Sequence, residues 1–137
     1  MRYIWAILIW VGIIPVAILN GGLRQYVLDV YCGSWSNPLS GLILALCIYF
    51  VAIWLVPKIK NCRRADYPVF GIIWFLQTNL FDLMMILRSG GEISAFLQMY
   101  DVASGNLWII VVASALLSPM LAGRKAMLKQ RNDLEKR

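Results

Sequence analysis

The chain has 137 residues, of which 61% are hydrophobic and only 15% are charged, whereas an ordinary soluble domain has about 25% charged residues. A soluble domain of this size leaves roughly a third of its unfolded surface exposed to water, so it cannot bury this much apolar area. The composition excludes a soluble enzyme domain, a disordered chain and a disulfide scaffold, and it predicts an integral membrane protein.

The net charge of +6 comes with no histidine at all. The basic residues lie between and after apolar segments, so we interpret them as topological signals and expect no nucleic-acid partner. Three cysteines, Cys32, Cys47 and Cys62, fall in different segments without a C-x-x-C pair. We therefore expect no metal site and no cofactor.

Four apolar stretches are long enough to cross a bilayer, which takes about 17–25 residues per helix. They cover about residues 3–22, 38–57, 67–87 and 105–123. Helices satisfy their own backbone groups in lipid, so the fold class expected is an all-α membrane protein with four transmembrane helices in an antiparallel bundle. This single domain spans residues 1–123. The first stretch is long for a signal peptide and lacks a small-residue cleavage site, so we expect it to be retained.

The basic residues are concentrated in the loop between the second and third stretches and in the tail. They are Lys58, Lys60, Arg63, Arg64, Arg124, Lys125, Lys129, Arg131, Lys136 and Arg137. Positive residues stay on the cytoplasmic side, and an even number of spans then puts both termini in the cytoplasm. The basic cytoplasmic tail, residues 124–137, is expected to continue the fourth helix.

The two loops on the opposite side show helical patterns. The first stretch is expected to continue as a helix through Leu28. In the second loop, Ile93, Phe96, Leu97 and Tyr100 follow the i, i+3, i+4, i+7 pattern. This predicts a short amphipathic interfacial helix near 92–101, which lies on the membrane surface or caps the bundle.

Helix–helix contacts are predicted at two kinds of position. Small residues four apart, such as Ser114 and Ser118, predict close helix packing. Three aromatic residues lie deep in their stretches and are expected to pack between helices: Trp10, Tyr49 and Trp74.

The third stretch carries the richest set of intramembrane polar residues: Gln77, Thr78, Asn79 and Asp82. Such groups need partners and are functional candidates. Arg24, at the end of the first helix, lies about 8–9 Å nearer the outer surface than Asp82 at 1.5 Å of rise per residue. Its side chain is long enough to close most of that gap, so an Arg24–Asp82 ion pair can form.

Two interpretations of these residues stay open. In the functional one, Asn20, Arg24, Gln25, Asn79 and Asp82 form a polar pocket that is open to the outside and binds an anion or a small polar solute, or relays a proton. In the structural one they are interhelical hydrogen bonds, each contributing about 0.6 kcal/mol. We favour the structural interpretation for Gln77 and Thr78.

Several short motifs resemble a pattern in small bacterial four-span inner-membrane proteins with no assigned activity. Asn20-Gly21-Gly22-Leu23-Arg24 matches N-G-x-x-R at the end of their first helix. Pro38-Leu39-Ser40-Gly41 matches the start of the second, and Phe81-Asp82 an aromatic–acid pair in the third. Tyr100-Asp101 with Gly105-Asn106-Leu107-Trp108 matches Y-[DN]-x-x-x-G-x-L-W, and Leu117-Ser118-Pro119 fits the end of the fourth helix.

The resemblance implies the bacterial inner membrane and a cluster facing outward. The cluster holds Asn20, Arg24, Asp82, Tyr100 and Asp101. Gln25 stands where the pattern has a glutamate, so this chain has no carboxylate next to Arg24. The resemblance implies no activity.

Three functions compete. The first is binding or transport of a small polar solute or ion at the polar cluster, which for transport needs a homo-oligomer. The second is an accessory or structural subunit that packs against another membrane protein. The third is an enzyme acting on lipid with Asp82 or Asp101 as acid or base, which the lack of histidine and of paired carboxylates disfavours. The lipid bilayer is a partner in every case.

Overall fold

A computed structural model describes residues 1–104 and 107–137, and these residues form helices and turns without a strand. The all-α prediction is therefore confirmed for the described part of the chain. Three apolar segments are long enough to cross a membrane: Arg2–Lys58, Asp66–Arg88 and Trp108–Glu135. The chain thus has the helices of a membrane protein.

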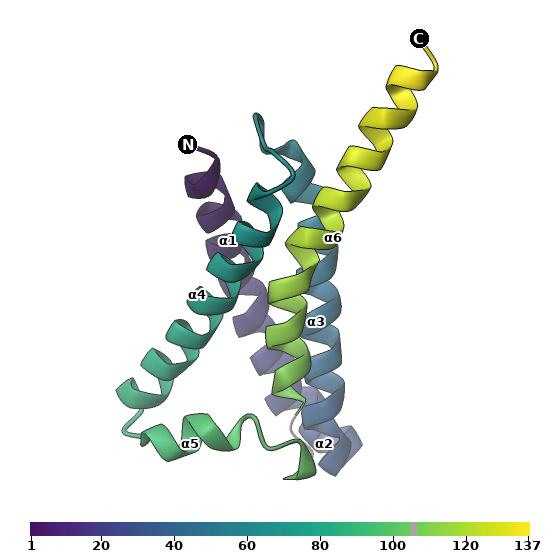
Figure 1. The fold of residues 1–137 in the computed structure, drawn as a ribbon. Helices are drawn as coiled ribbons and strands as arrows, with labels where there is room; N and C mark the ends of the chain where they lie inside the picture. The colour runs from purple at the N-terminus through teal and green to yellow at the C-terminus, as the bar shows by residue number, and fades with distance from the viewer. Residues whose placement is uncertain (105–106) are drawn as a thin grey trace.

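The first of these segments contains a sharp turn. Helix α1 (Arg2–Leu23) continues through a π-helical stretch, Arg24–Leu28, into α2 (Asp29–Cys32). Gly33 then adopts a φ of 56°, which glycine tolerates because it has no Cβ atom. After a short 3-10 turn, α3 (Ser36–Leu55) runs back beside α1, as Figure 1 shows. The expectation that the first helix continues through Leu28 is confirmed.

The second half of the chain also consists of two long helices joined by shorter helical segments. Helix α4 (Asp66–Arg88) diverges from α6 toward its end, and α5 (Ile93–Gln98) crosses the space between them (Figure 1). A 3-10 turn (Val102–Ser104) follows, and α6 (Trp108–Glu135) then runs back through the tail. Gly105 and Asn106, where the fourth span was predicted to begin, lie outside the described residues.

Helix α6 makes the most extensive contacts, with α3 on one side and α4 on the other. Gly71 of α4 lies so close to α6 that a Cβ atom there would collide with the Leu116 carbonyl oxygen. Gly123 likewise leaves room for the ring of Tyr67. The Ser114 hydroxyl donates to the Ala45 carbonyl oxygen at 2.9 Å, so the small-residue row of the fourth helix does form a close helix contact.

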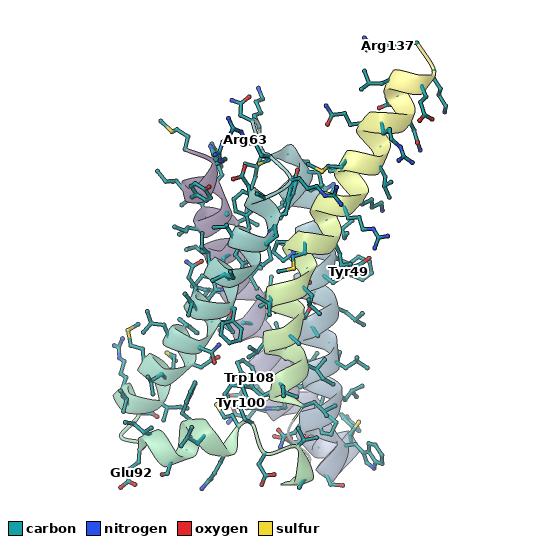
Figure 2. The ribbon with its side chains drawn as sticks, viewed as in Figure 1. Tyr49, Arg63, Glu92, Tyr100, Trp108 and Arg137 are labelled. Atoms are coloured by element: carbon teal, nitrogen blue, oxygen red, sulfur yellow. The ribbon has the colours of Figure 1, made fainter. Side chains whose placement is uncertain are left out.

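Two of the three deep aromatic residues pack between helices as predicted. Trp74 is fully buried and donates from Nε1 to the Ala6 carbonyl oxygen at 2.9 Å. Trp10 is 9% exposed and donates to the Thr78 hydroxyl at 3.0 Å. The prediction for Tyr49 is wrong: it is 37% exposed and projects from the outer side of the helices in Figure 2. Depth along a helix does not fix which way a side chain faces.

The molecule has two unlike ends. Both termini are drawn at one end in Figure 1. Arg63, labelled in Figure 2, lies at this end, and Arg2, Lys58 and Lys60 line one pocket together with Met1; we call this the basic end. The other end holds α2, α5 and the start of α6, and we call it the cavity end.

Candidate functional site

A cavity of about 370 Å³ lies at the cavity end, where α1, α3, α4 and the start of α6 meet. This volume falls within the range of about 300–1,000 Å³ that small-molecule sites occupy. Its wall is mostly apolar, with polar groups at a few positions, as is usual for such sites. The polar and indole groups come from Asn20, Arg24, Asn37, Ser40, Asp82 and Trp108.

Asn20 is the most firmly held of these residues. It is 8% exposed, and its Nδ2 donates to the Ser40 carbonyl oxygen at 3.1 Å and to the Ser40 hydroxyl at 2.9 Å. These two bonds fix the amide plane. They leave Oδ1 buried without a hydrogen-bond partner, so Asn20, a residue of the cavity wall, has a fixed acceptor that no group of the described residues uses.

Asp82 contributes a second acceptor from α4. Its Oδ2 is buried and has no hydrogen-bond partner among the described residues. A buried polar atom left unpaired costs about 1–3 kcal/mol, and more when the group is charged. A solute in the cavity that could donate a hydrogen bond to this oxygen would therefore be stabilised.

The donors of the cavity lie on its other walls. Arg24 donates from Nη1 to Asn37 Oδ1 at 3.5 Å, and both residues are exposed. Trp108 Nε1 is buried without an acceptor in hydrogen-bonding geometry, although the indole lies near the Tyr100 hydroxyl (Figure 2). Over the described ranges, 1–104 and 107–137, the ion pairs are Arg2–Asp66 and Arg131–Glu135. The Arg24–Asp82 pair is therefore not formed, and both side chains face the cavity separately.

The floor of the cavity is closed by satisfied groups. A void of about 50 Å³ extends it toward Trp10 and Thr78. Thr78 accepts from Trp10 and donates to the Trp74 carbonyl oxygen at 2.7 Å, so it acts as the structural link that we expected. The prediction that Gln77 also links helices is not met by its side-chain carbonyl, because Oε1 is buried and accepts no hydrogen bond within the described part of the chain.

The other predicted site residues lie outside this cavity. Asn79 donates to the Phe75 carbonyl oxygen at 2.8 Å and accepts a hydrogen bond from Tyr100. This contact ties the chain after α5 to α4, and burial raises the pKa of the Tyr100 phenol. Gln25 is exposed on the π-helical stretch. Asp101 is also exposed, and its Oδ1 accepts from the Ala103 amide at 3.1 Å. The structure thus brings Asn20, Arg24 and Asp82 to one cavity, but not the other four.

Sequence reasoning missed Asn37, Ser40 and Trp108. The sequence did contain a signal for Ser40, because Ser36 and Ser40 are one helical turn apart and so share a face. Both are buried in the structure, at 4% and 5% exposure. The sequence analysis used Ser40 only as part of the motif Pro38-Leu39-Ser40-Gly41. That Asn37 contacts Arg24 depends on the hairpin at Gly33 and could not be derived from spacing.

In the described part of the chain, no group of three His, Cys, Asp or Glu side chains is placed to hold a metal ion. Comparison with protein-family models, with curated proteins and with solved structures finds no match for this chain. The chemistry of the cavity is therefore the main guide to the function of the protein.

Proposed function

We propose that this protein crosses the bacterial inner membrane four times in an antiparallel bundle, with both termini in the cytoplasm. The turn at Gly33 supports four spans, because it divides the long apolar run into α1 and α3, of 22 and 20 residues. The excess of Lys and Arg at the basic end supports the orientation. The cavity end then faces outward.

We further propose that the cavity binds a small polar solute or ion from the outside. One observation carries this proposal: two residues that line the same cavity, Asn20 and Asp82, each have a buried acceptor atom without a partner among the described residues. Arg24 and Trp108 add donors to other walls. A ligand that carries at least one donor group, such as an ammonium or a hydroxyl, complements this set, because it would pair the atoms that the protein leaves unpaired.

The closed floor favours binding over conduction by a single chain. Beyond the Trp10–Thr78 hydrogen bond, the side chains of Trp74 and Phe70 are fully buried between the helices. A solute in the cavity therefore meets packed side chains before it can reach the basic end. Transport would need a homo-oligomer or a second arrangement of the helices.

Thermal unfolding of the detergent-purified protein with a panel of amines, amino acids, sugars and inorganic anions tests the proposal. A ligand at about 100 times its Kd stabilises the folded state by about 2.7 kcal/mol, so one class of solute should raise the Tm of the wild type. Asp82→Asn and Arg24→Ala should fold and lose this rise. Asp29→Asn, an exposed change at the same end, should keep it. The proposal fails if no class raises the Tm, or if both cavity variants respond like the wild type.

The accessory-subunit alternative rests on a different surface. Several small residues already make contacts within the chain, but a Cβ atom at Gly12 of α1 would meet nothing within 4 Å. This open side of α1 is where a partner helix could approach closely. Recovery of a stoichiometric partner in mild detergent, lost in Gly12→Leu, would favour this function over solute binding.

A further inference from the structure

A second cavity lies at the basic end, far from the solute site. It is a groove of about 460 Å³ between the start of α1 and the loop that follows α3. Its lining combines two kinds of side chain. The cationic ones are Arg2, Lys58 and Lys60, and the apolar ones include Trp5, Ile9 and Leu55.

A buried carboxylate holds the two walls of this groove together. Asp66 is 4% exposed and accepts from the Arg63 amide at 2.6 Å and from the Tyr3 hydroxyl at 3.0 Å. It also pairs with Arg2 Nε at 3.2 Å. Arg2 Nη1 in turn donates to the Asn61 carbonyl oxygen at 3.1 Å, where a φ of 60° turns the loop back toward α1. The groove is therefore a fixed feature of the fold.

The positive charge of the groove is only partly compensated. Asp66 neutralises Arg2, whereas neither lysine of the groove is ion-paired with an acid in the described part of the chain. Lys58 Nζ lies 4.3 Å from the centroid of the Trp54 ring, a cation–π contact that positions the ammonium without removing its charge. An anionic group in the groove would lie beside two lysines whose charge no acidic side chain of the described residues compensates.

The apolar wall decides what kind of anion fits. Trp5 is 57% exposed and lies next to the cationic rim, with Ile9 one turn further along α1. A soluble anion would use only the rim, whereas a phospholipid would place its phosphate among the cations and its acyl chain along Trp5 and Ile9. We propose that this groove binds an anionic phospholipid, with the headgroup phosphate held by Lys58, Lys60 and Arg2.

This site does not depend on the solute cavity, and it agrees with the proposed orientation. Anionic lipids of the cytoplasmic leaflet attract basic segments at the membrane surface with about 1 kcal/mol per Lys or Arg. The basic end would face that leaflet. The interaction also explains why these lysines lie beside an apolar groove, an arrangement that a topological signal alone does not require.

Native mass spectrometry of the detergent-purified protein tests this inference. Equal amounts of phosphatidylglycerol and phosphatidylcholine are added, and the bound lipid is counted. The wild type should retain phosphatidylglycerol in preference, and Lys58→Gln with Lys60→Gln should reduce its retention by about tenfold or more. Lys125→Gln with Lys136→Gln, which changes the net charge equally but lies outside the groove, should retain it like the wild type.

Two further measurements distinguish a phospholipid from free phosphate, and a loss of binding from a loss of folding. Inorganic phosphate at the same concentration should not displace the bound phosphatidylglycerol, because it cannot use the apolar wall. Lys58→Arg with Lys60→Arg should restore the retention that the glutamine pair loses. The inference is overturned if both lipids are retained equally, if the two glutamine pairs behave alike, or if phosphate displaces the lipid.

Discussion

The two ends of the molecule treat their buried carboxylates in opposite ways. At the basic end, the buried carboxylate of Asp66 has three partners, and the helices nearby touch through Gly71 and Gly123. At the cavity end, the carboxylate of Asp82 and the amide of Asn20 each leave a buried oxygen unpaired beside an open volume. A carboxylate with several partners holds elements of the fold together, whereas a carboxylate with an unpaired oxygen beside a cavity is available to a ligand.

The largest effect is expected where the helices touch most closely. In Gly71→Ala, the new Cβ atom meets the Leu116 carbonyl oxygen, so α4 and α6 must separate. Overpacking of this kind costs about 1–3 kcal/mol, occasionally more. Thermal unfolding in detergent should show a clear loss of stability. Gly12→Ala, where nothing lies within 4 Å of the new atom, should be neutral or slightly stabilising; equal losses in the two variants would contradict the close contact.

A smaller loss of stability is expected from Asp66→Asn. The amide cannot keep the ion pair with Arg2 and the bonds from Tyr3 and the Arg63 amide together, so the loop separates from α1. The protein should unfold at a lower temperature, and the loop should be cut more readily by trypsin. Asp133→Asn in the exposed tail serves as the control, and a matching loss there would argue against the Asp66 network.

Tyr100→Phe should have a weaker and local effect. It removes the hydrogen bond that ties the chain after α5 to Asn79 of α4, and one such bond contributes about 0.5–1.5 kcal/mol net. Hydrogen exchange should rise in the segment around α5 while the helices α3 and α6 stay protected. Tyr26→Phe, at a side chain that is 76% exposed, should leave hydrogen exchange around α5 unchanged. An equal rise in that variant would contradict the role of the Tyr100 hydrogen bond.

The smallest effect on stability is expected at Asp82, despite its burial. Because Oδ2 has no partner to lose, Asp82→Asn should leave the free energy of unfolding unchanged or raise it. The change in the free energy of unfolding should then differ in sign or in size between Asp82→Asn and Asp66→Asn, when both are measured in the same detergent. A loss at Asp82 as large as that at Asp66 would mean that the carboxylate is structural, which would break the contrast between the two ends.

The helical elements could be predicted from the sequence because membrane helices need long apolar runs. The prediction of a helix over about 67–87 agrees closely with α4 at Asp66–Arg88, and the basic tail does continue the last helix. The amphipathic helix near 92–101 is present but shorter, at Ile93–Gln98. Its apolar residues Ile93 and Leu97 are 60% and 64% exposed, as a helix on a membrane surface requires.

The site could be predicted only in part, because rotation of the helices about their axes is not encoded in spacing along one helix. Asp82 was found because an acid in an apolar stretch needs an explanation. Asn79 shares its face by spacing, yet its amide donates to the Phe75 carbonyl oxygen and accepts from Tyr100. The Asp66 network was missed, since its partners are 63 residues away for Tyr3 and depend on how α1 meets α4.

Cysteine accessibility tests the central claim, a wet cavity open to the outside, most directly. In a chain without its native cysteines, Asp82→Cys is treated in intact cells with a charged, membrane-impermeant thiol reagent. The account predicts reaction from the outside, whereas Leu80→Cys, at a side chain that is 65% exposed on α4 and would face lipid, should stay unreacted. Reaction of Asp82→Cys only after the reagent reaches the cytoplasm, or none at all while the exposed Ser89→Cys reacts, would contradict it.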